Sequence, residues 1–226
     1  VIFDGASNGD TLNGGAGIDT FDWSGLSVGV ATTVNLTVGN WSYAGGSETV
    51  TGFENVKGAD QTGVIKETVI GNALVNQIFG NGGDDILNGM AGADLLNGGA
   101  GGDFLVGGLG SDNMTGGAAN DVFQYNSIGE RGDIITDYSN VAGNNDTFRI
   151  SAAGFGGGLV AGGVLAASQF QIRADNVAQD ANDRFIFRTT DKTLWFDANG
   201  SAAGGLFLVA DLQASATMSA ADIVIF

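Results

Sequence analysis

The stretch Gly80–Gln124 decides the fold, because it repeats one nine-residue unit five times in succession. The copies read GNGGDDILN, GMAGADLLN, GGAGGDFLV, GGLGSDNMT and GGAANDVFQ. Every copy begins with glycine, has aspartate at its sixth position and carries a large apolar residue at its eighth. The five aspartates are Asp85, Asp94, Asp103, Asp112 and Asp121. A strict period this short indicates an array in which each unit packs against its neighbours.

Each position of the unit has a physical role. Glycine at the first, fourth and often the second position lets the chain adopt positive φ or bring two backbones into contact. The first six residues therefore form a turn whose carbonyls point inward, and the eighth lies in a short strand and points into a core. Two units make one coil, so turns two units apart stack at about the 4.8 Å strand spacing. The stacked pairs are Asp85 with Asp103, Asp94 with Asp112, and Asp103 with Asp121.

Stacked carboxylates require a positive charge between them. Two charges about 5 Å apart repel by on the order of 3 kcal/mol at an effective dielectric constant of 20. A set of ligands made only of oxygen, with six to eight members, favours calcium over magnesium. We expect the carboxylates to be joined by carbonyls of the second and fourth positions, which are Asn81, Gly83, Met90, Gly92, Gly99, Gly101, Gly108, Gly110, Gly117 and Ala119.

The repeat resembles the calcium-binding nonapeptide GGxGxDxUx of RTX (hemolysin-type) proteins. This resemblance implies an all-β fold, a right-handed parallel β-roll or β-solenoid that holds several calcium ions in its turns, about four or more. A calcium-free solenoid built on Asx-turns is the alternative, but it would not require aspartate at every sixth position.

Composition agrees with a protein that needs cations. The chain has 226 residues with 25 acidic and 8 basic side chains, a formal charge of −17. This charge argues against nucleic acid and anionic membranes as partners, and it destabilises the compact state unless cations bind. Without calcium we expect at least the repeats to be disordered. There is no cysteine for a disulfide and no apolar run long enough to span a membrane.

Residues 1–124 are predicted to form the roll. Two further units, GASNGDTLN and GGAGIDTFD, occupy residues 5–22, and they add Asp10 and Asp19 as calcium ligands whose stacking partners lie upstream or in the next coil. Residues 23–70 are predicted to be an insertion of longer coils, with a strand at 28–38 and a strand pair around Gly52 at 48–56. Residues 62–79 are degenerate repeats, in which Asn76 can offer an oxygen opposite Asp94.

Residues 125–226 are predicted to form a largely antiparallel β cap. Their pattern of aspartate and apolar residues resembles that of the segment that follows the repeats in secreted RTX metalloproteases. Asp133, Asp137 and Asp146 are either a further calcium site or solvated strand ends. The terminus Asp222, Ile223, Val224, Ile225, Phe226 resembles an uncleaved type I secretion signal and also fits a final strand, and both can hold.

No catalytic site is predicted, because histidine and cysteine are absent and the aligned aspartates are better used as cation ligands. We therefore expect a calcium-dependent folding and secretion module of a larger extracellular bacterial protein, with the type I secretion apparatus as its partner. We expect it in the medium or at the cell surface, with no insertion into membranes. The alternatives are a unit of a surface layer, fibre or adhesin that self-associates through calcium, and an accessory module that binds polysaccharide through calcium.

Overall fold

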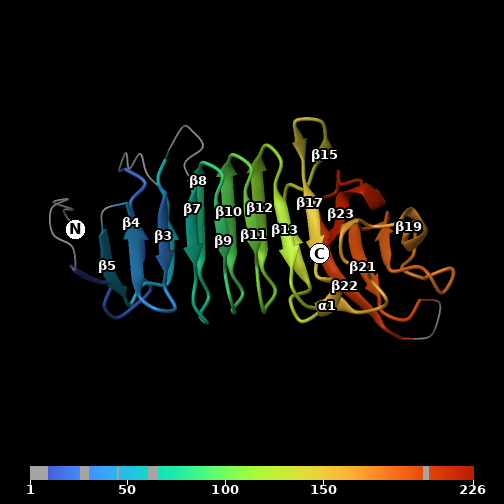
Figure 1. Cartoon of the computed structure of the whole chain (residues 1–226), viewed down its shortest axis with the longest axis horizontal. Helices are drawn as coiled ribbons and strands as arrows, with labels where there is room; N and C mark the ends of the chain where they lie inside the picture. The colour runs from blue at the N-terminus through green and yellow to red at the C-terminus, as the bar shows by residue number, and fades with distance from the viewer. Residues whose placement is uncertain (1–9, 26–30, 45, 61–65, 201–203) are drawn as a thin grey trace.

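The molecule is an elongated stack of strands along one axis, from the N-terminal strands at one end to the C-terminal sheet at the other (Figure 1). The structure, a computed structural model, describes residues 10–25, 31–44, 46–60, 66–200 and 204–226. In this part of the chain, the strands build two large sheets, one of eleven strands and one of ten.

Successive repeat units contribute strands to opposite sheets. One sheet contains β7 (Glu67–Ile70), β9 (Ile86–Asn88), β11 (Phe104–Val106) and β13 (Val122–Tyr125), and the other contains β8 (Gln77–Gly82), β10 (Leu95–Ala100) and β12 (Asn113–Ala118). All neighbours are parallel, and Phe104 pairs with Ile86 on one side and Val122 on the other. The predicted coil of two units and the parallel β-roll are confirmed.

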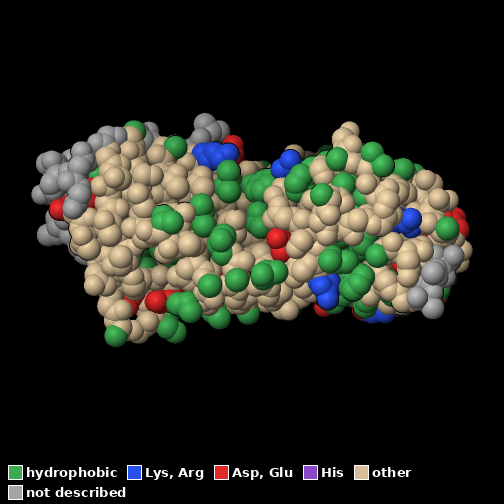
Figure 2. Space-filling view, turned by 60° about the horizontal axis from the view of Figure 1, so that its bottom comes forward, with side chains coloured by type: hydrophobic (Ala, Val, Ile, Leu, Met, Phe, Trp, Pro, Cys, Tyr) green, Lys and Arg blue, Asp and Glu red, His purple; other side chains and the backbone are tan. Residues whose placement is uncertain are grey.

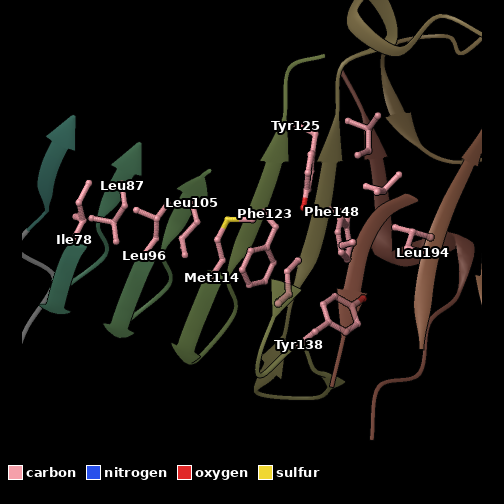
Figure 3. Packing of buried hydrophobic residues seen from close by; sticks show 14 of the residues in the cluster. Ile78, Leu87, Leu96, Leu105, Met114, Phe123, Tyr125, Tyr138, Phe148 and Leu194 are labelled. Atoms are coloured by element: carbon pink, nitrogen blue, oxygen red, sulfur yellow. The ribbon is translucent and has the colours of Figure 1, made fainter. Parts of the chain in front are cut away.

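The core of the roll is a single file of eighth-position side chains between the two sheets. Figure 3 shows them in order, alternately from one sheet and the other. Each has an exposed fraction of 0 or 1%. Because side chains alternate along a strand, the seventh and ninth positions face outward and the eighth faces the core. The file consists of Ile78, Leu87, Leu96, Leu105, Met114 and Phe123.

Parallel pairing continues past Gln124. Here β14 (Asp133–Ile135) lies between β12 and β22 (Leu206–Leu212), while β17 (Thr147–Ile150) lies between β13 and β23 (Ile223–Ile225). The core is also continuous across this point. The division into two domains at Gln124 stays a prediction, but strand pairing and core both cross it.

The C-terminal region is a mixed sheet rather than a purely antiparallel one. Antiparallel pairs join β20 (Phe185–Arg188), β21 (Thr193–Asp197) and β22, whereas β19 (Phe170–Arg173) is parallel to β20. The smaller elements are β15 (Asn140–Val141), β16 (Asn144–Asn145), β18 (Gly163–Val164), the short α-helix α1 (Ala152–Phe155), and the 3-10 turns Ala167–Gln169 and Ala220–Asp222.

The N-terminal insertion differs from the expected longer coils. β1 (Thr11–Asn13) and β2 (Thr20–Asp22) pair in parallel with β5 (Gly46–Thr51) and β6 (Asn55–Lys57). However, β3 (Thr32–Asn35), β4 (Asn40–Tyr43) and β5 form an antiparallel meander within the first sheet. The predicted strand at 28–38 is shorter in the structure, because Gly39 has a φ of 69° and the chain reverses there. Residues 28–30 lie outside the described residues.

Candidate metal centre

The sixth-position aspartates are buried and stacked as predicted. Each has an exposed fraction of 1 or 2%. In every case one carboxylate oxygen, Oδ1, accepts a hydrogen bond from the backbone N–H of the sixth-position residue in the preceding stacked turn. The donor–acceptor distances are 2.7 Å from Asp85 to Asp103, 2.8 Å from Asp94 to Asp112 and 2.8 Å from Asp103 to Asp121. The backbone of one turn thus fixes the carboxylate of the next.

The second carboxylate oxygen of each aspartate has no partner. Oδ2 of all five repeat aspartates is buried without a hydrogen bond. This oxygen lies against the first glycine of its own unit, and a Cβ at Gly98 would lie 2.2 Å from Oδ2 of Asp103. A buried charged oxygen without a partner is costly, so each of these atoms calls for a proton or a cation.

Burial dominates the titration of these groups. It raises the pKa of Asp85 and Asp121 from the ordinary value of 3.8 to about 7, that of Asp94 to about 6 and that of Asp103 to about 8. The backbone N–H donor acts in the opposite direction, and the neighbouring carboxylates in the stack add to the rise. The pKa of Asp112 is also raised by burial. The stack therefore holds protons tightly when no cation is present.

The turns have a regular backbone conformation. The second and fourth positions have positive φ in the repeats, including the non-glycine residues Asn81, Met90 and Ala119. Their carbonyls do not all point inward, as the sequence suggested. The Met90 oxygen accepts from the Leu109 N–H at 2.9 Å, and a Cβ at Gly101 would lie 1.9 Å from the Gly83 oxygen. These carbonyls point along the stack toward the next turn.

The available atoms fit a hard cation. The unpaired groups are carboxylate oxygens, the accompanying polar atoms are backbone carbonyls, and oxygen is the donor that calcium prefers. Among the described residues no three acidic side chains gather into one cluster. A calcium ion bound here would therefore take most of its ligands from carbonyls and water, and the aspartates would supply the charge.

The three acids beyond the repeats do not behave alike. Asp133 continues the stack, because its Oδ1 accepts from the Asp112 N–H at 2.9 Å and burial raises its pKa to about 7. Unlike the repeat aspartates, its carboxylate has a tyrosine hydroxyl, that of Tyr125, as a side-chain partner that lowers the pKa. Asp146 accepts from the N–H groups of Asp121 and Ser139, so both its oxygens are used. Asp137 accepts with both oxygens from Gly116 and Gly117. Only Asp133 shares the geometry of the repeats.

The N-terminal stacks contain two acids that the sequence pattern did not single out. Glu48 and Glu54 occupy sixth positions, since the N–H groups of Asp10 and Asp19 donate to their carboxylates. The pattern that could have identified them is an acid followed two residues later by a buried Val50 or Val56. Oδ2 of Asp19 is buried and unpaired, as in the repeats.

Asn76, predicted as a weak ligand, lies in its expected place opposite Asp94, whose Oδ1 accepts from its N–H at 2.8 Å. Its own side-chain oxygen already accepts from the Asn72 N–H at 2.8 Å. The residues 5–9 of the first N-terminal unit lie outside the described part, so the turn that precedes Asp10 cannot be compared with the others.

The C-terminal segment is a strand inside the fold. Asp222 is buried in a capping box with Ser219, and β23 pairs with β17 and β18. The ring of Phe226 lies 4.3 Å from the guanidinium carbon of Arg149. The expectation of a final strand is confirmed, and the secretion signal stays a prediction.

The exposed surface is consistent with the burial of the repeat aspartates. Figure 2 shows few red carboxylate side chains on the face in view, in agreement with the burial of the repeat aspartates. No helix in the described residues is long and apolar enough to cross a membrane.

Comparison with known proteins points to the same repeats. Residues 70–105 and 98–125 match the family described as RTX calcium-binding nonapeptide repeat (4 copies). Among solved structures, the chain is similar to the AlgE6R3 subunit of the mannuronan C5-epimerase of Azotobacter vinelandii. The identity is 27% over 70% of this chain and 77% of that chain, with a TM-score of 0.29. That score carries no argument about the fold, which rests on the strand pairing above. None of the curated proteins matches the chain.

Proposed function

We propose, from the premise that this chain contains RTX calcium-binding nonapeptide repeats, that it is a calcium-dependent folding module of an extracellular protein. In this proposal the chain leaves the cell unfolded and calcium folds it outside. It binds about four or more ions in the stacked turns. Any catalytic activity belongs to another part of the protein to which the module is attached.

One observation carries the proposal. The repeats bury a row of carboxylate oxygens that no protein group pairs, in a chain with a formal charge of −17. Such a row opposes folding until a cation or a proton neutralises it. Ligand binding that occurs only in the folded state adds its free energy to folding.

The difference between compartments can act as the switch. Extracellular calcium modules typically bind with dissociation constants of roughly 0.1–1 mM. Cytosolic calcium lies far below this range, so the repeats would stay unfolded before export and fold after it. The absence of cysteine agrees with stabilisation by metal in place of disulfides.

Export would proceed through a type I apparatus that recognises the C-terminal segment Asp222–Phe226. This part of the proposal is supported by the acidic residue followed by four apolar residues at the terminus. The same segment pairs as β23 in the folded molecule, so recognition would have to precede folding.

The first test is calcium titration of the wild type and two variants, followed by circular dichroism and calorimetry. Asp103→Asn removes the charge of a residue that contacts the stacked turns on both sides. Asp211→Asn, the control, removes the charge of an exposed acid on β22. We expect the wild type to gain β structure cooperatively with several ions bound. Asp103→Asn should need about tenfold or more calcium, and the control should match the wild type.

A wild type that is fully folded without calcium and binds none would contradict the proposed function. Export is tested separately, by measuring secretion of the full chain and of a chain without residues 222–226 in cells with a type I exporter. Asp103→Asn should still be exported, because its C-terminal segment is intact, although it folds poorly. Export of the truncated chain at the wild-type level would rule out the signal. Calcium-dependent growth in particle size by light scattering would indicate an assembly unit instead.

A further inference from the structure

The two turns that precede the repeats in the stack differ from all the later ones. In the described residues the first consists of residues 58–60 and Glu67, and the second of residues 71–76, and we refer to these two sets as the two leading turns. Gly58 and Ala59 stack on Gly80 and Asn81, and we number them as first and second positions for that reason. Their sixth-position residues, Glu67 and Asn76, are buried with exposed fractions of 1 and 0%. They stack directly on the first repeat turns, because their N–H groups donate to Oδ1 of Asp85 and Asp94, each at 2.8 Å.

The side-chain oxygens of these two residues are already paired within the protein. Oε1 of Glu67 accepts from the indole Nε1 of Trp23 at 2.9 Å, and Oε2 accepts from the Ala59 N–H at 3.1 Å. Oδ1 of Asn76 accepts from the Asn72 N–H at 2.8 Å. In both turns the N–H of the second position is thus a donor to the sixth. In the five repeats this donor is absent, and Oδ2 of each aspartate is left unpaired.

The amide of Asn76 is also fixed on its nitrogen. Nδ2 donates to the Glu54 carbonyl at 2.7 Å and to Oδ1 of Asn72 at 3.1 Å. This orientation directs the nitrogen, and not a free oxygen, toward the neighbouring backbone. Asn76 is uncharged, and both its side-chain oxygen and its side-chain nitrogen are hydrogen-bonded within the protein.

The backbone conformation of the leading turns also differs from that of the repeats. The second position has positive φ in every repeat, but neither Ala59 nor Asn72 has positive φ, and Leu74 at the fourth position does not either. With this conformation the second N–H faces the side chain of the sixth residue. The left-handed conformation of the repeats withdraws that N–H and leaves the carboxylate oxygen open.

The residue at the second position changes at the junction between the leading turns and the repeats. A Cβ at Gly99 would lie 2.1 Å from the Asn81 oxygen, and one at Gly108 would lie 2.2 Å from the Met90 oxygen, so glycine is required there. Asn81 and Met90 themselves carry side chains at the same position, since the turn before each has another conformation. Asn81 uses its side chain to donate to the Gly58 carbonyl at 2.6 Å.

From these contacts we propose that the two leading turns bind no calcium and form a metal-free platform on which the calcium-dependent repeats stack. Trp23, Ala59 and Asn72 donate hydrogen bonds to the side-chain oxygens that cations would coordinate in the later turns. Calcium sites then begin at the turns that contain Asp85 and Asp94. The inference rests on calcium binding by the repeats, but it does not depend on export.

The test compares two isosteric variants of adjacent acids in one stack, in the full chain. Glu67→Gln and Asp85→Asn each remove one charge. In Asp85→Asn the amide oxygen can keep the hydrogen bond from the Glu67 N–H. In Glu67→Gln the amide oxygen can accept from Trp23 or from Ala59, and the amide nitrogen then faces the other donor, so this variant should also lose stability. We expect Asp85→Asn to raise the calcium midpoint roughly tenfold or more, as loss of a ligand does. Glu67→Gln should leave the number of bound ions unchanged, whereas Asp85→Asn should lower it. An equal loss of bound ions in both variants would overturn the platform and identify Glu67 as a ligand.

Hydrogen exchange of the wild type gives a second measurement that needs no variant. On addition of calcium, amides of β11 and β13 should gain protection by roughly a hundredfold or more, and those of β7 by less than about tenfold. Equal gains in β7 and β11 would contradict a metal-free platform. If the wild type binds no calcium at all, the proposed function and the platform both fail. If it binds calcium and only the Glu67 result is adverse, the function stands and the platform falls.

Discussion

At the scale of single residues, the identity of each turn position depends on the turn stacked beside it. The first glycine is required because Oδ2 of its own aspartate fills the place of a Cβ. The second and fourth positions need glycine only where a carbonyl of the preceding turn points at them. Ala119, at the fourth position of the last unit, keeps the positive φ of the other turns, at 89°, although it carries a side chain. Sequence alone showed the glycines but not this reason for them.

Gly101→Ala should be strongly destabilising. Gly101 has a φ of +123°, and a Cβ there would lie 1.9 Å from the Gly83 oxygen. Left-handed strain of about 1–2 kcal/mol adds to about 1–3 kcal/mol of overpacking. Gly143→Ala is the matched control, because it has a φ of +92° with no atom within 4 Å. Thermal unfolding with calcium should show the larger loss only for Gly101→Ala, and equal losses would mean that the neighbouring carbonyl does not matter.

At the scale of elements, the strands of the roll are held mainly by their single inward side chain. Leu105→Ala should lower the free energy of unfolding by about 2–5 kcal/mol, because Leu105 is fully buried in the file between the sheets. Leu109→Ala should change it by about 0.5 kcal/mol or less, since that side chain is 55% exposed. Denaturant unfolding in saturating calcium measures both. Similar losses for the two would be inconsistent with the assigned register.

The strands of the repeats were predictable because a nine-residue period repeats the same local choice five times. The insertion was not, because its strands pair out of sequence order. β1 pairs with β5, while β3 pairs with β7, and no local pattern in residues 23–70 specifies such partners. A largely antiparallel β region was predicted for residues 125–226, but the parallel pairing of β22 and β23 with the roll depends on contacts between distant segments.

At the scale of the whole molecule, stability without calcium should fall as the pH rises. The folded-state pKa values of the stacked aspartates lie at about 6 for Asp94 and about 8 for Asp103, above the ordinary value of 3.8. A raised pKa means that the folded state holds protons more tightly than the unfolded state. The resulting stability is present below about pH 4 and is lost as the pH rises through 6 to 8.

This dependence is measured by circular dichroism in calcium-free buffer between pH 5 and 8, with calcium removed by a resin because chelators weaken in acid. We expect more β structure at pH 5 than at pH 8. Work near the sequence pI of about 4.1 is avoided, since the net charge vanishes there and association follows. A calcium-free β signal that does not change with pH would contradict the buried, unpaired carboxylates.

The sequence by itself determined the parallel coil, its single-file core and the stacking of the aspartates, because these follow from a short period that needs no distant partner. Only the tertiary structure decided which acids stay unpaired. Asp133 and Asp146 are alike in sequence, yet the Ser139 N–H donates to the second oxygen of Asp146, whereas Asp133 has only the buried Tyr125 hydroxyl as a side-chain partner. Glu67 is paired by Trp23, 44 residues away. Such hydrogen bonds join segments that only the folded chain brings together, and they separate a carboxylate that needs a cation from one that does not.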